Sequence, residues 1–178
     1  MTPTHLPGRV AIPALPEQPR TPSPTALHAF NTAAEDDAHR FLASCLNSTR
    51  WTHRVAAHRP YPDLDALLAA ADEAAYDLSP TDLTQALAAE TLPALPTDMY
   101  EAAHLALGAA HAAYETRFGH AFVISLATVT PDECLNHVLT TIHTRLSHDP
   151  EKERAVAADQ LRRLARDRLT THLRAASK

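Results

Sequence analysis

The sequence predicts a single-domain, all-α protein, and three observations support this prediction. Alanine and leucine, both strong helix formers, dominate the composition, whereas glycine occurs three times and aromatic residues make up 5%. Helix-start signals recur along the chain, as described below. The length of 178 residues with 45% hydrophobic content suits one core of ordinary size. We therefore expect a single multi-helix domain over residues 26–178.

Residues 1–25 differ in composition from the rest of the chain. Seven of the 14 prolines lie in the first 24 residues. Proline lacks a backbone donor and blocks helix formation. We expect either a disordered leader or an extended proline-rich arm, which would pack Val10, Ile12 and Leu15 onto the domain or a partner subunit.

Three or four short helices are expected before residue 92. Ser23 or Thr25 is the predicted cap of the first. The stretch DLDALLAAADEAAYDL has acidic residues in its first turn, and Ser79 before Pro80 is a further start signal. Pro60 and Pro62 separate two of these helices.

A longer helix is predicted from about Met99 to Arg117, and its inward stripe carries several polar groups. A rotation of about 100° per residue places six bulky side chains on one face. They are Tyr100, His104, Leu107, His111, Tyr114 and Phe118. Gly119 is the predicted left-handed closing residue, and the β-branched run after it predicts a short buried extended segment.

Two more helices are predicted towards the C-terminus. One begins at Thr130 and Pro131 and reaches about Ser147, and the other begins with Asp149 as cap and Pro150 in its first turn. The second is amphipathic, with an apolar face of Ala158, Leu161, Leu164, Ala165 and Leu169. Arg154 and Arg168 fall on the same face. An inward arginine needs a carboxylate partner, which a ligand could supply.

Charge and composition narrow the range of partners. Sixteen basic against 21 acidic residues give a formal charge of −5, so no overall positive field attracts nucleic acid or an anionic membrane surface. No stretch approaches the roughly 20 apolar residues of a membrane span. We expect a cytoplasmic protein whose partner is a small molecule, a small carboxylate above all, or another protein.

The cysteines and histidines carry no metal pattern. Cys45 and Cys134 form no CxxC pair and are expected to be reduced, buried thiols. Among the 12 histidines, no two have the i, i+4 spacing that puts two imidazoles on one helix face. No Gly-rich phosphate loop occurs either. We expect neither a metal nor a cofactor.

Four stretches in order carry a resemblance to a known family. They are STRW at 48–51, RPYPDLDALLAAADEA at 59–74, AAYETRFGHAFVI at 112–124 and DPEKERAVAADQLRRLARDRL at 149–169. Together they resemble the 2-oxo-4-hydroxy-4-carboxy-5-ureidoimidazoline (OHCU) decarboxylase family, which completes urate oxidation to (S)-allantoin. The resemblance covers about residues 26–173. It implies an all-helical fold peculiar to the family, no cofactor or metal, and commonly a homodimer.

The resemblance also implies where a substrate lies and where this chain departs from the family. The segment after Gly119 lines the family's pocket, which assigns Phe122, Val123, Ile124, Ser125 and Leu126 to substrate binding; the alternative is that their side chains only fill the core. The family's catalytic His-Pro pair is replaced by Glu90 and Thr91. A following loop with a Ser-x-x-Glu-Gln pattern is missing. Only 24 positions separate Glu90 from Tyr114, whereas the resemblance implies roughly twenty more.

Other residues are candidates for the lost roles. Arg154 is the candidate carboxylate anchor. Glu90, His104 and His111 are candidate proton donors, because a histidine titrates near neutral pH and a buried carboxyl keeps its proton. The alternatives are core or channel histidines and a solvated Glu90. Two functions remain open: a divergent, cofactor-independent carboxy-lyase for a ureidoimidazoline or related heterocycle, or an inactive paralogue that binds a small acid or a protein.

Overall fold

The computed structural model describes residues 26–93 and 101–175, and all regular secondary structure in this part of the chain is helical. The all-α prediction is confirmed. The helices are α1 (Ala26–Thr32), α2 (Glu35–Cys45), α3 (Thr49–Ala57), α4 (Leu64–Tyr76), α5 (Pro80–Ala89), α6 (Glu101–Phe118), α7 (Pro131–Arg145) and α8 (Pro150–Ala175). The predictions for the N-terminal arm, for the caps Ser23 and Thr25 and for Tyr100 lie outside the described residues.

Between residues 26 and 92, the described part of this stretch, the chain forms five helices and not the three or four predicted. The boundary between α1 and α2 accounts for part of the error, because it contains no glycine or proline. Ala34, the residue before α2, makes no side-chain capping hydrogen bond. A helix break without a capping side chain leaves no signal in the sequence.

Predicted caps after this point are confirmed. Ser79 forms a capping box with Asp82 at the start of α5, and the carboxylate of Asp149 accepts from the Lys152 backbone N–H at 2.9 Å. Gly119 has φ of 76° and its N–H donates to the Glu115 carbonyl at 2.8 Å, closing α6. A Cβ at Gly119 would meet no atom within 4 Å, so the left-handed backbone alone favours glycine here.

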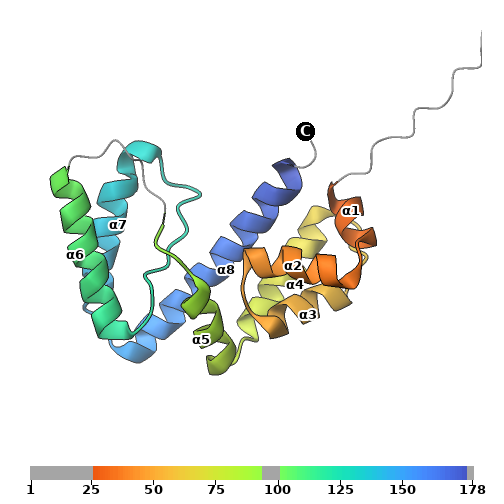
Figure 1. The fold of residues 1–178 in the computed structure, drawn as a ribbon, viewed down its shortest axis with the longest axis horizontal. Helices are drawn as coiled ribbons and strands as arrows, with labels where there is room; N and C mark the ends of the chain where they lie inside the picture. The colour runs from red at the N-terminus through yellow and green to blue at the C-terminus, as the bar shows by residue number, and fades with distance from the viewer. Residues whose placement is uncertain (1–25, 94–100, 176–178) are drawn as a thin grey trace, which may run out of the picture.

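The described residues form two hydrophobic clusters, and the long helix α8 belongs to the larger one (Figure 1). The larger cluster packs α8 against α1–α5 and is centred on Leu42, Trp51, Leu67, Leu161 and Leu169, all fully buried. The indole N–H of Trp51 donates to the Ala71 carbonyl at 2.9 Å, which ties α3 to α4. Cys45 lies in the same cluster, and burial raises the pKa of its thiol to about 11. Both cysteines are buried and free, as predicted.

The smaller cluster holds α6 and α7 beside each other, away from α1–α4 (Figure 1). Its members are Leu107, Tyr114, Phe122, Ile124, Val138 and Ile142. Residues 121–126 between the two helices form no regular secondary structure, and positions 122–124 are buried, as the sequence predicts. Among the described helices, none has both the length and the hydropathy that crossing a membrane requires.

Candidate functional site

A pocket of ≈ 290 Å³ opens where the end of α5 meets α8 and the segment after α6. We call it the Glu90 pocket. It is lined by Glu90, Thr91, Leu92, Pro93, Phe122, Val123, Ile124, Leu126, Leu164 and Arg168. Four of the five segment residues predicted to bind substrate therefore share a pocket with Glu90. Their apolar side chains form one wall, and Glu90 and Arg168 bring the charged groups.

Glu90 and Arg168 form a two-pronged ion pair in this pocket. The guanidinium Nη1 and Nη2 of Arg168 donate to Oε1 and Oε2 of Glu90 at 2.8 and 2.7 Å. The Glu90 side chain is only 5% exposed, and Arg168 also donates to the Cys45 carbonyl at 2.9 Å. The hydrogen bond to Glu90 raises the pKa of Arg168 above its usual range. The inward position predicted for Arg168 is confirmed, and its carboxylate comes from the protein itself.

Hydrogen bonds to α7 and α8 fix the segment that forms the apolar wall. Arg145 donates to the Val123 carbonyl at 2.6 Å. The backbone N–H of Ser125 donates to Gln160 at 2.9 Å, and its hydroxyl donates to Asp167 at 2.5 Å. These polar groups of the segment are therefore occupied by the protein. Ser125, which does not line the Glu90 pocket, positions the wall instead.

A buried charged network supports this wall from behind. Glu153 on α8 is fully buried, and its carboxylate accepts from Arg145 Nε at 2.8 Å and from the Tyr114 hydroxyl. His148 Nδ1 lies 2.9 Å from the same carboxylate. Burial alone would raise the pKa of Glu153, but the hydrogen bonds from Arg145, Tyr114 and His148 hold it below its usual value. The network connects α6, α7 and α8 directly beneath the segment.

Sequence reasoning missed this network, although a signal was present. Arg145 follows Val138 and Ile142 on the buried face of α7. Glu153 stands four residues before Ala157 on the buried face of α8. A charged residue at a core position of an amphipathic helix indicates a buried partner, and these two residues are partners of each other.

The two candidate histidines are placed differently. His111 is buried, with its ring centroid 6.0 Å from that of Phe122. Its Nε2 has no hydrogen-bond partner among the described residues, and burial lowers its pKa below the ordinary 6.5. The prediction that His104 points inward was wrong, because its side chain is exposed. The buried stripe on the described part of α6 begins one turn later, at Leu107.

The inward orientation predicted for Arg154 was also wrong. Arg154 is exposed, and the buried position on that turn belongs to Glu153. The helical stripe of α8 recurs every four residues from Glu153 to Leu173, which places position 154 one step to the side. Arg154 instead lines a second pocket, of ≈ 220 Å³, beside Arg117, Gly119 and His120. The structure therefore separates Arg154 from Glu90.

The fold and pocket define an all-helical protein with an arginine and a glutamate facing an apolar cavity of small-molecule size. The sequence model described as OHCU decarboxylase matches residues 31–98 and 90–170, and the chain belongs to this family. The family prediction is thus confirmed. No curated protein matches the sequence.

Solved structures agree with the family fold. A crystal structure of (S)-allantoin synthase aligns with a TM-score of 0.64 at 20% identity, covering 82% of this chain and 53% of that one. A crystal structure of OHCU decarboxylase in the presence of (S)-allantoin aligns with a TM-score of 0.62 at 16% identity, covering 78% of this chain and 97% of that one. The chain spans about half the length of the allantoin synthase chain. At these identities the likeness concerns the fold.

Proposed function

We propose that the protein is an OHCU-decarboxylase-like lyase, which removes CO2 from a ureidoimidazoline or a related small carboxylated heterocycle of purine degradation without a cofactor. The observation that carries the proposal is the Glu90–Arg168 pair facing the apolar wall of the Glu90 pocket. Membership of the family supports the reaction class. The pocket's volume of ≈ 290 Å³ suits a single small heterocycle.

Arg168 is the proposed carboxylate anchor. Its planar guanidinium already binds a carboxylate through two parallel hydrogen bonds, and this geometry is equally suited to a ligand carboxylate. A substrate carboxylate would take the place of Glu90. The displaced Glu90 would then face the apolar wall of the pocket without its cation, beside the bound ligand.

Decarboxylation can then proceed with this chain's own groups. The bond between the ring carbon and the carboxylate breaks, CO2 leaves, and the electron pair stays on the carbon next to the imine and carbonyl. The displaced Glu90 takes up a proton from solvent and delivers it to that carbon, forming the C–H bond, and the resulting Glu90 carboxylate returns to Arg168. A positioned general acid contributes about 10²- to 10⁴-fold to such a step. Delivery from one side gives one stereoisomer.

The other candidate residues receive less support from the geometry. His111 packs against Phe122 without lining the Glu90 pocket, and His104 faces solvent. Arg154 lies in the second pocket. We therefore assign proton transfer to Glu90 and carboxylate binding to Arg168. A homodimer, a cytoplasmic location and a single domain over residues 26–178 remain predictions.

A second candidate function is binding without catalysis. The positive charge of Arg168 is already neutralised by Glu90, so a ligand carboxylate must compete with a protein group. The two stretches matched by the family model meet at residues 90–98, where the sequence predicts the loss of the catalytic loop. Both observations favour an inactive paralogue that binds a small acid.

An assay of stereospecific product formation tests these proposals. Substrate would be generated from urate by urate oxidase and the hydrolase that follows it, and the optical activity of allantoin recorded. We expect acceleration above the spontaneous rate by the wild type, loss of it in Arg168→Met, and no change in Arg163→Met, a partly exposed arginine of α8. No acceleration, together with calorimetric binding of a carboxylated analogue, would select the second function. If the assay detects no turnover and calorimetry detects no binding, both proposed functions are rejected.

A further inference from the structure

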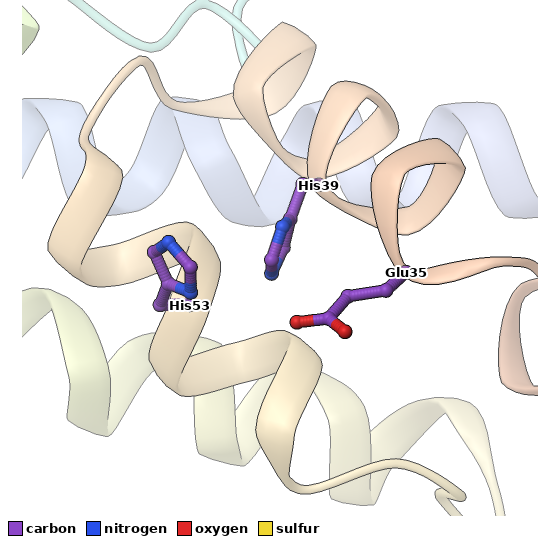
Figure 2. Close-up of side chains that lie close together, drawn as sticks. All are labelled: Glu35, His39 and His53. Atoms are coloured by element: carbon purple, nitrogen blue, oxygen red, sulfur yellow. The ribbon is translucent and has the colours of Figure 1, made fainter.

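A cluster of metal-ligating side chains lies on α2 and α3, outside the Glu90 pocket. Glu35 and His39 are one turn apart on α2, and His53 lies on α3; Figure 2 shows the Glu35 carboxylate and the His39 ring extending from α2 towards the side of His53. One potential ligand atom from each residue lies within 4.8 Å of the other two. The rings of His39 and His53 meet edge to face, with centroids 4.3 Å apart.

The three groups are accessible and have no competing partners in the described part of the chain. No hydrogen bond or ion pair there engages the Glu35 carboxylate or the ring nitrogens of His39 and His53. They line a surface pocket of ≈ 270 Å³ together with Ala56, Ala57 and Arg59. Glu35 and His53 are exposed and His39 is partly buried, so an ion can reach the ligand atoms from solvent.

The separations are close to those of a coordinated ion. Bonds of about 2.1 Å in a tetrahedral site place ligand atoms about 3.4 Å apart. The three groups therefore need to close by roughly 1.4 Å at most, which side-chain rotation provides. The helices need not move, since Ala38 and Leu42 hold α2, and Trp51 and Val55 hold α3, in the main core.

We propose that Glu35, His39 and His53 form a binding site for a divalent transition metal of the Zn²⁺ class. Two imidazoles and one carboxylate are ligands typical of zinc, with the fourth position open to water. Mg²⁺ and Ca²⁺ prefer oxygen-only sets and are poorly matched. None of the three residues lines the Glu90 pocket, so the ion takes no part in the proposed decarboxylation. It would link α2 to α3.

The charges around the cluster are compatible with a cation. The first turn of α2 carries Glu35, Asp36 and Asp37, of which Asp37 is paired with Arg40. Arg59 adds a positive charge to the lining of the same pocket, and its guanidinium donates to the carbonyls of Phe30, Ala33 and Ala56. Arg59 lowers the affinity by repulsion, while Glu35 and Asp36 oppose that effect.

Calorimetric titration of the full, untagged chain with zinc chloride tests the site. We expect one site per chain that is stronger than any other. His39→Gln, His53→Gln and Glu35→Gln should each weaken it by more than about tenfold, since changes even to outer-shell groups cost about 10- to 100-fold. The matched control is His143→Gln, an exposed histidine on α7, which should leave the site intact. Circular dichroism would establish that each variant is folded.

Two further readouts complete the test. Zinc should raise the melting temperature of the wild type and of His143→Gln, and not that of the triple variant of Glu35, His39 and His53. Magnesium chloride should give neither heat nor a shift. The proposal is overturned if the triple variant binds zinc as tightly as the wild type, if the control loses binding equally, or if magnesium binds as well as zinc. Because the assay for decarboxylation uses other residues, failure here leaves that proposal intact.

Discussion

The carboxylate of Glu90 accepts two parallel hydrogen bonds from the guanidinium of Arg168, across a separation of 78 residues in sequence. The pair joins the end of α5 to α8 and lines the Glu90 pocket. Arg168 is therefore held in a geometry for carboxylate binding before any ligand arrives. A ligand carboxylate must therefore compete with Glu90 for Arg168.

Replacing Glu90 should separate binding from chemistry. In Glu90→Gln we expect turnover to fall about 10²- to 10⁴-fold, because the general acid is lost. The affinity for a stable carboxylated heterocycle such as hydantoin-5-acetic acid should be retained or rise, because a neutral amide competes less for Arg168. Optical activity measures turnover and calorimetry measures affinity. Glu101→Gln, an exposed change on α6, is the control. Unchanged turnover in Glu90→Gln would remove Glu90 from the mechanism.

Removing the buried carboxylate beneath the pocket wall should destabilise the protein strongly. Glu153→Ala leaves the buried Arg145 without its partner, which costs about 3–5 kcal/mol in comparable buried pairs. Urea denaturation measures the change in the free energy of unfolding. Glu151 lies two positions before Glu153 on α8 and is exposed, so Glu151→Ala should change this free energy by less than about 0.5 kcal/mol. Equal effects of the two substitutions would contradict a structural role for the network.

Replacing Gly108 and Gly119 by alanine should change the free energy of unfolding in opposite directions. Gly119 has φ of 76°, so Gly119→Ala should cost about 1–2 kcal/mol in backbone strain. Gly108 lies within α6 in open space, so Gly108→Ala should stabilise by about 0.8–1 kcal/mol through helix propensity. Thermal and urea unfolding of the two variants measure these changes. Two shifts of the same sign would be inconsistent with this reading.

Burial of His111 should make stability depend on pH. Because burial lowers its pKa below 6.5, the unfolded chain binds a proton more readily than the folded chain. The contribution of neutral His111 to the free energy of unfolding is therefore complete above pH 6.5. It is lost as pH falls from 6.5 towards the folded-state pKa of His111, by up to about 1.4 kcal/mol per pH unit. His111→Leu and His111→Phe should both flatten this part of the profile, measured by urea unfolding at a series of pH values. An unchanged slope in both variants would count against a buried, neutral His111.

The sequence predicted those parts of the fold that local chemistry determines. Ser79, Asp149 and Gly119 were legible because caps and left-handed glycines act within one turn. His104 and Arg154 were misplaced because helical periodicity gives a direction but not where the contact with a neighbouring helix begins or ends. On α6, the stripe of bulky residues extends beyond the part of the helix that is buried against its neighbours.

The partners of buried charges were the other gap. Arg168 was expected to face inward and to need a carboxylate, yet its partner Glu90 lies on another helix end, 78 positions away. The same holds for Tyr114 and Glu153, which are 39 positions apart. Pairings across such distances depend on tertiary packing, for which a single sequence carries no periodic signal. The Glu35–His39 spacing was local, but the third group, His53, comes from α3.

A crystal structure of the protein with bound hydantoin-5-acetic acid tests the central claim most directly. We expect the ligand's carboxylate at Arg168, with the Glu90 side chain turned away and the ring against Phe122 and Ile124. A ligand bound beside Arg154 in the second pocket, or an intact Glu90–Arg168 pair in the presence of bound ligand, would contradict it.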